Sequence, residues 1–478
     1  MLVSLALMAV STTAPVNVVF LFTDDHRRTA VGALGIEPVK TPNIDSLLAE
    51  GTFFQNAYTM GSPHGALCVP SRAMLMTGRN LWHIGPRNPE TGAVDVGRIR
   101  EEFTTWPEVF RANGYETFGT GKWHNNRDAF NRLFSHGGAI YFGGMHWPDT
   151  NGHFEPRIHW FDPTSDYPES DRKHLKTFSS ELYADGAIDF LQNTRDKEKP
   201  FVIYVAFSSP HDPRSAPQEY HDMYPPAEIE LPPNFAPIHP FDNGDMNVRD
   251  EKLSPVPRTV ERTKKEISDY YAMVSEVDFH IGRILAELKR QGLDRNTIVV
   301  FAGDHGLAVG QHGLLGKQNV YEHSMGLPLV FRGPGIPRGR TRESFVYHHD
   351  AGPTLLELAG LEVPETMESK SLVEAIKSPG VQVRESIYLS YQNKQRAVRV
   401  GDLKLILYNV DGVERTQLFD LSTDPWEMQN LFILYGRPGE FGPGQRLLNA
   451  LRARMKEEDD PAYEIFFGSS SEEDRIEQ

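Results

Sequence analysis

The 478-residue sequence contains a single cysteine, Cys68, and fewer basic than acidic side chains. One cysteine cannot form an internal disulfide, so no oxidised framework holds this fold. Lysine and arginine together number 49 against 65 aspartates and glutamates, and the formal net charge is -16. This balance predicts no nucleic-acid partner, because affinity for phosphate backbones depends on clustered basic residues. Any anionic ligand must instead be held by a local positive site.

Long apolar runs and internal repeats are also missing from the sequence. The apolar run "MLVSLALMAV", Met1 to Val10, is far shorter than the roughly 20 residues that span a bilayer, which predicts no stable membrane insertion. With the following "STTA" it resembles the core and cleavage zone of a secretory signal, although the basic start of such signals is missing. We therefore expect a signal-like segment over residues 1–14 and an exported protein, periplasmic or secreted. A plain N-terminal extension is the alternative.

Three apolar, β-rich runs indicate strands that are buried on both faces, at residues 16–22, 201–207 and 297–303. Such runs without polar alternation are typical of a parallel sheet. Helical patterns that begin at residues 181 and 268 separate them. This alternation predicts an α/β fold with a large mixed, mostly parallel sheet flanked by helices. In such a fold, ligands bind beyond the carboxyl ends of the strands.

The pattern changes after about residue 378. Short extended runs and a final amphipathic helix follow, at 386–392, 397–410, 416–421 and 444–457. We interpret this part as a small antiparallel α+β subdomain that packs on the large one. The predicted division is a catalytic α/β domain over residues 15–378 and a C-terminal antiparallel-sheet subdomain with a terminal helix over residues 379–478.

Acidic residues follow two of the predicted strands. Asp24 and Asp25 are adjacent after the first, and charges this close repel unless a cation or protons compensate them. Asp304 and His305 follow the third. Three carboxylates and an imidazole could surround one divalent ion, and oxygen-rich ligation favours calcium or magnesium. Either pair alone would more simply cap a helix, but two pairs on strands of one sheet favour a metal site.

The stretch around the cysteine, "CVPSRAMLMTG" from Cys68 to Gly78, resembles the C-x-P-S-R-x4-T-G signature of the type I sulfatases. Further segments agree in order along the chain: "LFTDDHR", "TPNIDSLLAEGTFFQNAY", "GKWH", "SPHDP", "GDHG", "GLLGKQNVYEHSMGLPLVFRGPG" and "LFDLSTDPWEMQNL". The resemblance covers nearly the whole chain. It implies an alkaline-phosphatase-like fold and a sulfuric ester hydrolase.

The resemblance also implies a chemical reason for the single thiol. In this family the cysteine is oxidised to formylglycine, so we expect a formylglycine-generating or sulfatase-maturing enzyme as a partner. The hydrated aldehyde has two hydroxyls on one carbon: one attacks sulfur, and loss of the proton from the other then expels sulfate. A thiol would form an adduct that is hard to release.

The motif match assigns roles around this nucleophile. The expected metal ligands are Asp24, Asp25, Cys68, Asp304 and His305. The expected catalytic residues are Cys68, Arg72, Lys122, His124, His211 and Lys317. Arg72 would steady the hydrate, and the two lysines would hold sulfate oxygens. His124 would take the proton of the second hydroxyl, and His211 would protonate the leaving oxygen.

One metal position departs from the commonest pattern of the family. Many sulfatases have asparagine where His305 stands, whereas the iduronate-2-sulfatase type has Asp-His. Imidazole is a softer ligand than an amide oxygen and suits calcium less well, but the remaining ligands are carboxylates, so we expect Ca²⁺ with Mg²⁺ as the alternative.

The substrate is predicted from weaker signals. Residues 135–163 are rich in histidine and tryptophan, which suits stacking on sugar rings and pairing with sulfate or carboxylate groups. The candidate substrate-binding residues are Tyr141, His146, Trp147, Arg157, His159, His312 and His323. The alternative is a lid packed on its own aromatic side chains. We expect a sulfated polysaccharide or glycosaminoglycan-type carbohydrate as substrate.

Other functions fit parts of the same pattern. A phosphonate monoester or phosphodiester hydrolase can use the same cysteine signature and fold, and an arylsulfatase would differ only in substrate. A metal-dependent phosphatase of the same superfamily would need serine or threonine in place of Cys68. A further alternative is a glycan-binding protein without catalytic activity. Such a protein would not need the catalytic residues, yet every expected catalytic position is occupied here.

Overall fold

The computed structural model describes residues 15–88, 94–432 and 442–468. The predicted signal-like segment, residues 1–14, lies outside the described residues. The largest element is an 8-stranded sheet. Across the sheet the strands are β11 (Arg340–Tyr347), β2 (Thr52–Tyr58), β10 (Leu329–Arg332), β9 (Thr297–Gly303), β1 (Asn17–Thr23), β8 (Phe201–Ala206), β4 (Glu116–Lys122) and β5 (His136–Tyr141).

The three strands expected from the sequence form the centre of this sheet. β1 is parallel to both β8 and β9, so that Phe20 lies between Tyr204 and Val300. Every residue of β1 is buried, which explains its unbroken apolar run. β4 is parallel to β8 and β5, and β11 is parallel to β2, whereas β10 runs antiparallel to both of its neighbours. The predicted α/β fold with a mixed, mostly parallel sheet is confirmed.

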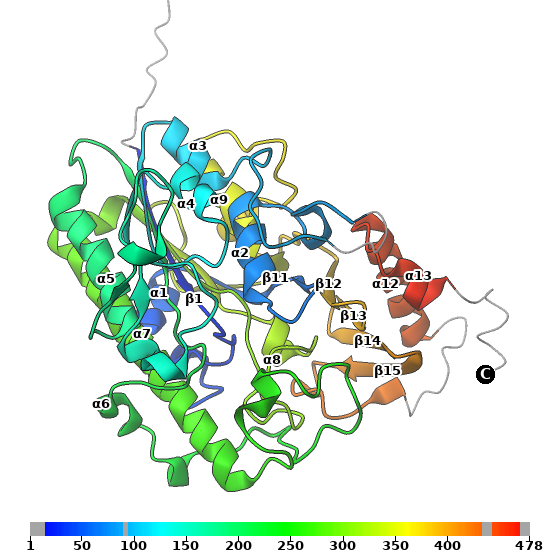
Figure 1. The fold of residues 1–478 in the computed structure, drawn as a ribbon. Helices are drawn as coiled ribbons and strands as arrows, with labels where there is room; N and C mark the ends of the chain where they lie inside the picture. The colour runs from blue at the N-terminus through cyan, green and yellow to red at the C-terminus, as the bar shows by residue number, and fades with distance from the viewer. Residues whose placement is uncertain (1–14, 89–93, 433–441, 469–478) are drawn as a thin grey trace, which may run out of the picture.

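Helices cover both faces of the sheet (Figure 1). Val19 and Leu21 of β1 belong to a core with Ile281 of α7, whereas Phe20 packs on the other face against Trp106 of α3. α1, α5 and α7 lie on the first side, and α2, α3, α4 and α9 on the second. The helices are α1 (Pro42–Glu50), α2 (Cys68–Thr77), α3 (Trp106–Ala112), α4 (Arg127–Leu133), α5 (Ser179–Asp189), α6 (Gln218–His221), α7 (Val260–Arg290), α8 (Glu322–Met325), α9 (Ala351–Leu358), α10 (Val373–Lys377), α12 (Pro443–Glu457) and α13 (Tyr463–Phe467).

A second, 5-stranded sheet carries the C-terminal part of the chain. Its strands are β15 (Val413–Asp420), β14 (Leu403–Val410), β13 (Gln395–Val400), β12 (Ser386–Tyr391) and β3 (Gly61–Ser62). β12 to β15 are antiparallel, and α12 packs on them (Figure 1), so the predicted small antiparallel subdomain with a helix is confirmed as an element of the fold. β3, which comes from the segment before Cys68, pairs with β12 and joins this sheet to the rest of the molecule. The boundary at residue 378 stays a prediction.

The parallel strands β1, β4, β8 and β9 bring their carboxyl ends to one edge of the large sheet. β4 is irregular at this edge, where its register with β5 shifts between Gly119 and Gly121. Gly121 has a φ of 91°, and a Cβ there would lie 2.0 Å from the Ala206 carbonyl oxygen. Glycine is therefore needed for β4 to bend directly before Lys122.

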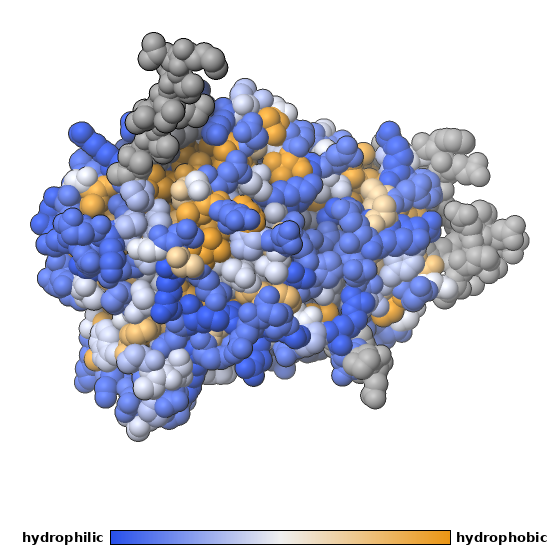
Figure 2. Space-filling view, turned by 90° about the horizontal axis from the view of Figure 1, so that it is seen from above, coloured by the Kyte–Doolittle hydropathy of each residue, from blue (hydrophilic) through white to orange (hydrophobic). Residues whose placement is uncertain are grey.

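The surface is mostly hydrophilic on the face seen in Figure 2. Apolar residues gather toward the middle of that face, whereas hydrophilic residues cover its margins and much of the C-terminal part. Among the described residues, none of the helices combines the length and the apolar character needed to cross a membrane. A two-stranded sheet of β6 (Arg157–Ile158) and β7 (Lys173–His174) lies in the long segment after β5.

Candidate active site

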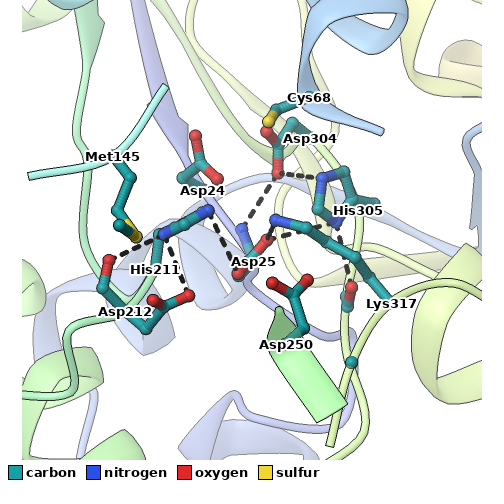
Figure 3. A network of polar contacts seen from close by, with 12 residues as sticks. Asp24, Asp25, Cys68, Met145, His211, Asp212, Asp250, Asp304, His305 and Lys317 are labelled. Atoms are coloured by element: carbon teal, nitrogen blue, oxygen red, sulfur yellow. Dashed lines mark hydrogen bonds and ion pairs between the residues drawn. The ribbon is translucent and has the colours of Figure 1, made fainter. Parts of the chain in front are cut away.

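Carboxylates, imidazoles and amines meet at the carboxyl edge of the large sheet (Figure 3). Two acidic residues follow β1, an Asp-His pair follows β9, a histidine follows β8, and a lysine ends β4. All of these side chains are buried. They are Asp24, Asp25, Lys122, His211, Asp304 and His305. The sequence prediction that strand ends collect the polar residues at one edge is therefore confirmed.

Cys68 lies at this edge as the first residue of α2 and is buried. The start of a helix presents partial positive charge to a side chain there. The Lys122 ammonium lies 3.8 Å from Sγ. Burial would raise the pKa of the thiol, but the positive charges of Lys122 and Lys317 bring it well below its usual value. The position therefore favours an anionic or strongly polarised group on this side chain.

Asp24 pairs with two cations. Its Oδ2 lies 2.7 Å from Arg72 Nη2 and 2.6 Å from Lys122 Nζ. Burial would raise the pKa of this carboxyl, yet Lys122 and Arg72 hold it well below its usual range. Arg72 also donates to the Lys122 carbonyl oxygen at 2.6 Å and lies over the Phe22 ring. Arg72 thus fastens α2, and with it Cys68, to the ends of β1 and β4.

Asp25 adopts a backbone conformation that non-glycine residues seldom use, with a φ of 62°. This turn lets its amide donate to Asp304 Oδ1 at 3.0 Å while its carboxylate faces Lys317, whose Nζ is 2.7 Å away. Burial would lower the pKa of Lys317, but the carboxylate of Asp25 raises it well above its usual value. Strained backbone of this kind is concentrated at functional sites, where the surrounding structure enforces it.

The pKa values of Asp304 and His305 are both raised by their surroundings. Burial, reinforced by the nearby charge of Asp24, raises the pKa of Asp304 to about 7. Burial would lower the pKa of His305, but Asp304 raises it to about 9. His305 Nε2 lies 3.6 Å from Asp304 Oδ1, and its Nδ1 lies 3.4 Å from Asp25 Oδ1. The Asp304 carboxylate is therefore less well compensated than that of Asp24, although Arg72 Nη2 lies 3.6 Å from its Oδ2.

Three polar atoms of this cluster are buried and have no hydrogen-bond partner: Asp24 Oδ1, Asp304 Oδ2 and His305 Nε2. Buried polar atoms are rarely left unsatisfied, because desolvation without a partner costs about 1–3 kcal/mol each. Ligand atoms of Asp24, Cys68, Asp304 and His305 lie within 4.8 Å of one another, as do those of Asp24, Asp25 and His211. An oxygen-rich set with one imidazole and unused lone pairs fits a divalent cation.

Two further histidines flank the cluster. His124 follows Lys122 with a φ of 53°, and its buried Nδ1 has no hydrogen-bond partner. Gly144 makes room for its ring, since a Cβ there would lie 2.6 Å from the imidazole. Burial lowers the pKa of His124, which favours the neutral base. His211 turns Nε2 toward Asp25 Oδ2 at 3.9 Å and has Nδ1 2.8 Å from the Asp212 carbonyl oxygen.

The residues predicted to bind substrate do not all lie together: some are buried in the segment after β5, others in that segment are exposed or partly buried, and two lie in a separate cluster. His146 and His159 are buried, and His146 stacks on Tyr141 with ring centroids 4.1 Å apart, as in a lid packed on its own aromatics. Trp147 is 56% exposed in the same segment. Arg157 begins β6 and is partly buried. The last two, His312 and His323, lie together with Glu427 in a separate cluster.

Several polar residues near the site were missed by the sequence analysis. Asp212 forms an ion pair with Arg249 and has its Oδ1 3.3 Å from His211 Nδ1. It could have been found, because it stands in the quoted segment "SPHDP". Arg249 has no comparable signal, since it lies outside any motif. Asn125 follows His124, and neither polar atom of its buried amide has a partner.

Comparisons with known proteins agree with this geometry. A family model described as Sulfatase matches residues 16–361, and one described as N-sulphoglucosamine sulphohydrolase, C-terminal, matches residues 310–456. The chain is 30% identical to the ulvan-active sulfatase of Formosa agariphila over 456 residues, which cover 92% of this chain and 80% of that protein.

Two solved structures are similar over almost the whole chain. One is described as a sulfatase, yidJ, of Bacteroides fragilis, with a TM-score of 0.75 and 25% identity, covering 96% of this chain and 99% of that one. The other is a complex with its substrate D-glucosamine-2-N,6-O-disulfate, with a TM-score of 0.73 and 25% identity, covering 94% of this chain and 99% of that one.

Proposed function

Because the chain belongs to the sulfatase family and is a sulfuric ester hydrolase, we propose that it removes sulfate from a sulfated carbohydrate with a formylglycine made from Cys68 as the nucleophile. The observation that carries this proposal is the placement of Cys68. Its side chain is buried at a helix start, 3.8 Å from an ammonium group and within reach of the metal-type cluster. The hydrated aldehyde would supply two hydroxyls on one carbon at this point.

The metal ligands proposed are Asp24, Asp25, Asp304 and His305, together with the modified Cys68. Calcium is the proposed ion, with magnesium as the alternative, because most donors are carboxylate oxygens. A bound divalent cation would supply positive charge to the nucleophile and to a sulfate oxygen. The three unpartnered atoms of the cluster support this assignment.

Lys122 and Lys317 are proposed to hold the sulfate oxygens. Each ammonium now pairs with an aspartate, Lys122 with Asp24 at 2.6 Å and Lys317 with Asp25 at 2.7 Å. Both aspartates are proposed metal ligands, so cation binding would draw their charge away from the lysines. The two ammonium groups would then be free to bind an anionic substrate, while Arg72 keeps α2 in position.

The two flanking histidines are proposed to move protons in different half-reactions. Burial lowers the pKa of His124, and the residue lies two positions after Lys122, whose ammonium is close to Cys68; this suits the base that takes the proton of the second hydroxyl. His211 Nδ1 is held by the Asp212 backbone and carboxylate. This contact leaves Nε2 to donate to the leaving oxygen.

A sulfated polysaccharide or glycosaminoglycan-type carbohydrate is the proposed substrate class. The relatives support it: one is described as acting on ulvan, and a structural neighbour was solved with a disulfated glucosamine. In this chain, Trp147 and Trp160 are 56% and 50% exposed in the segment after β5, and exposed indole faces suit stacking on sugar rings. Export and maturation of Cys68 by a formylglycine-generating or sulfatase-maturing enzyme belong to the same proposal.

Mass spectrometry combined with sulfate release tests the proposal. We expect the peptide that contains Cys68 to show conversion of the thiol to an aldehyde, in proportion to the rate of sulfate release from defined sulfated oligosaccharides. Cys68→Ser should be nearly inactive, because one hydroxyl can accept sulfate but has no partner to expel it. Full activity of a preparation in which Cys68 is entirely a thiol would contradict the nucleophile.

Substrate class is tested separately with matched esters. A sulfated sugar, an aryl sulfate, a phosphonate monoester and a phosphate diester should be compared at equal concentration of converted enzyme. We expect the sulfate monoesters to be preferred and at least one sulfated sugar to be turned over. A preference for the phosphorus esters would replace the sulfatase proposal with the diesterase alternative while leaving the nucleophile intact.

A further inference from the structure

We call the carboxyl edge of the large sheet, with Asp24, Asp25, Cys68, Asp304 and His305, the catalytic edge. A second group of metal-type ligands, two of them buried and one partly buried, lies outside it. His312, His323 and Glu427 each have a side-chain ligand atom within 4.8 Å of the others. They come from three parts of the chain: the loop after β9, α8, and the loop after β15. His323 is 8% exposed and Glu427 is 3% exposed. No role in the sulfatase reaction proposed above uses these three residues as a group.

A small cavity of about 40 Å³ borders this cluster and is lined by Asn234, His323, Trp426 and Glu427 among others. Two buried polar atoms there, His323 Nε2 and Asn234 Oδ1, have no hydrogen-bond partner. Asn234 is 7% exposed, so neither atom is compensated by bulk water. The cavity exceeds the roughly 10–15 Å³ that one water needs. Unused donor atoms therefore face a space that a small ligand could occupy.

We propose that His312, His323 and Glu427 form a second metal site for a divalent cation of the zinc class, with a water from the cavity as a further ligand. Two imidazoles and one carboxylate are a donor set that zinc binds in proteins, usually with four ligands. Imidazole nitrogen selects zinc and its neighbours over calcium or magnesium, which prefer oxygen. The proposed site would thus differ in metal from the catalytic edge.

The two imidazoles are prepared for ligation. The His312 ring stacks on Tyr321 with centroids 4.2 Å apart, and its Nε2 lies 3.2 Å from the Asn234 amide nitrogen, so its orientation is fixed. Burial lowers the pKa of His312 to about 3 and that of His323 well below its usual value. His323 thus offers an unused ring nitrogen to an ion, and His312 Nε2 would exchange its contact with the Asn234 amide for the ion.

Three cationic side chains lie near the proposed site and would repel a metal ion. All three also pair with a second glutamate, Glu322. Lys404 lies 2.8 Å from Glu427 Oε1 and 3.0 Å from Glu322 Oε1, while Arg28 and Arg399 pair with Glu322 Oε2 at 3.1 and 3.4 Å. Three cations and two glutamates meet here, so Lys404 already balances the charge of Glu427, and it is the two imidazole nitrogens that favour an ion of the zinc class.

The cluster also lies directly behind the catalytic edge. The Gly306 amide donates to the Ser324 carbonyl oxygen at 2.8 Å, and a Cβ at Gly306 would lie 2.2 Å from the His323 carbonyl oxygen. Gly306 is the residue after His305. An ion here would tie α8 to the loop after β15, and so hold the C-terminal sheet against the segment that positions His305. We therefore expect a structural site whose loss affects stability more than chemistry.

Zinc stoichiometry of the full chain tests the site. The protein is first saturated with Ca²⁺ and then titrated with Zn²⁺, the only probe metal. Gel filtration removes unbound metal, and inductively coupled plasma mass spectrometry measures the zinc that stays bound. We expect wild-type protein to retain one zinc per chain and to show a higher Tm with zinc than without it. His312→Gln and His323→Gln should lose both effects, since glutamine keeps the size but not the imidazole.

Two controls separate this site from the catalytic edge and from general histidine effects. Asp304→Asn should lose catalytic metal yet keep the zinc. His280→Gln should also keep it, because His280 is a buried histidine that pairs with Glu276 at 3.1 Å and belongs to none of the three-ligand clusters found among the described residues. If zinc disappears in Asp304→Asn but persists in His323→Gln, the ion belongs to the catalytic edge and the proposal is overturned.

Anomalous diffraction at the zinc edge on wild-type crystals needs no variant. A peak among His312, His323 and Glu427 is the expected result. Its absence from zinc-soaked crystals would overturn the site even if the glutamine variants fail to fold.

Discussion

The catalytic edge and the C-terminal pair Arg396–Asp460 are both buried charge clusters, but they differ in how completely their polar atoms are used. Each carboxylate oxygen of Asp460 accepts two bonds: Oδ1 from Arg396 and the Ala462 amide, Oδ2 from Arg396 and the Tyr388 hydroxyl. At the catalytic edge, by contrast, one oxygen each of Asp24 and Asp304 has no hydrogen-bond partner among the described residues, although Asp304 Oδ2 lies 3.6 Å from Arg72 Nη2.

The difference separates charges that hold a fold from charges that await a ligand. A buried ion pair with all its hydrogen bonds made is complete without any addition, so removing one member leaves a stranded charge. A carboxylate with an unused oxygen keeps a lone pair for a ligand even where, as for Asp24, cations already compensate its charge. In the second cluster, His323 Nε2 and Asn234 Oδ1 are likewise buried without a hydrogen-bond partner among the described residues. Since such atoms also occur elsewhere in the molecule, they indicate a site only where several metal-type ligands lie together, as at these two clusters.

The largest expected effect comes from breaking the incomplete cluster. Asp304→Ala or Asp24→Ala should lose the catalytic metal and lower the rate of sulfate release on the order of 10⁴-fold, as loss of a central catalytic group does. Chelation of wild-type enzyme should do the same and be reversed by Ca²⁺. Metal content and sulfate release are measured together, with Asp460→Asn as the control that keeps the metal. Unchanged turnover by exhaustively metal-free enzyme would show that the ligands are assigned wrongly.

His211→Ala should have the next largest effect, and the effect should depend on the leaving group. A sugar alkoxide needs protonation, so the loss should be roughly 10²–10⁴-fold on a sugar sulfate and distinctly smaller on an activated aryl sulfate. Equal losses of rate on both substrates would show that His211 is not the acid that protonates the leaving oxygen. His124→Ala is the matched variant, because it should trap a sulfated enzyme, visible by intact-protein mass spectrometry, whichever substrate is used.

The sequence predicts those strands and helices whose burial produces a pattern of apolar residues along the chain. β1, β8 and β9 were found because their residues are buried on both faces, and α7 because it is long and amphipathic. β2, β4 and β5 were not singled out. β4 has the sequence "ETFGTGK", in which polar residues and glycines surround one large apolar side chain, and β5 begins "HGG". Strands that bend around glycine lose the signal on which the prediction depends.

The site was predictable where its residues follow strands or stand in motifs, and not where loops meet in space. Asp24, Asp304 and Cys68 were proposed from sequence because a strand end or a signature marks them. Arg249 reaches Asp212 across a tertiary contact that no local pattern encodes. The same holds for the second cluster: His312 and His323 were proposed as substrate ligands, and Glu427, from a distant loop, was not considered.

The complete cluster should respond in stability rather than in chemistry. Arg396→Met keeps much of the side-chain volume but leaves Asp460 buried without its main partner. Removal of one member of a buried pair typically costs about 3–5 kcal/mol of unfolding free energy. Urea unfolding measures this loss, and the rate of sulfate release per folded molecule should stay close to that of the wild type. A variant as stable as the wild type would show that Arg396 and Asp460 contribute no net stabilisation.

The smallest expected effect is a difference in the sign of the pH dependence of the two clusters in metal-free protein. Burial raises the pKa of Asp304 to about 7, so the folded state keeps a proton that the unfolded chain releases above about pH 4. The raised pKa of His305, about 9, acts in the same direction at higher pH, because its contribution is present below the unfolded pKa of about 6.5 and is lost as pH rises through 9. The contribution of Asp304 and His305 to the unfolding free energy should therefore fall as pH rises from about 4 to 9. Asp304→Asn should remove this fall, so that the difference between the two curves isolates it, because the variant lacks both the carboxyl and the partner of His305, whereas the other titrating groups are common to both proteins.

Asp460 has the opposite shift: burial would raise its pKa, but Arg396 holds it below the usual range. Its contribution is present above the unfolded pKa of about 3.9 and is lost as pH falls below that value. Arg396→Met should therefore lower the whole curve above this pH and change its slope chiefly on the acid side.

Urea unfolding in chelator across this pH range, for wild type and both variants, gives three curves. Parallel curves for wild type and Asp304→Asn would mean that the charge of Asp304 is as well compensated as that of Asp460, and the contrast between the two regions would not hold.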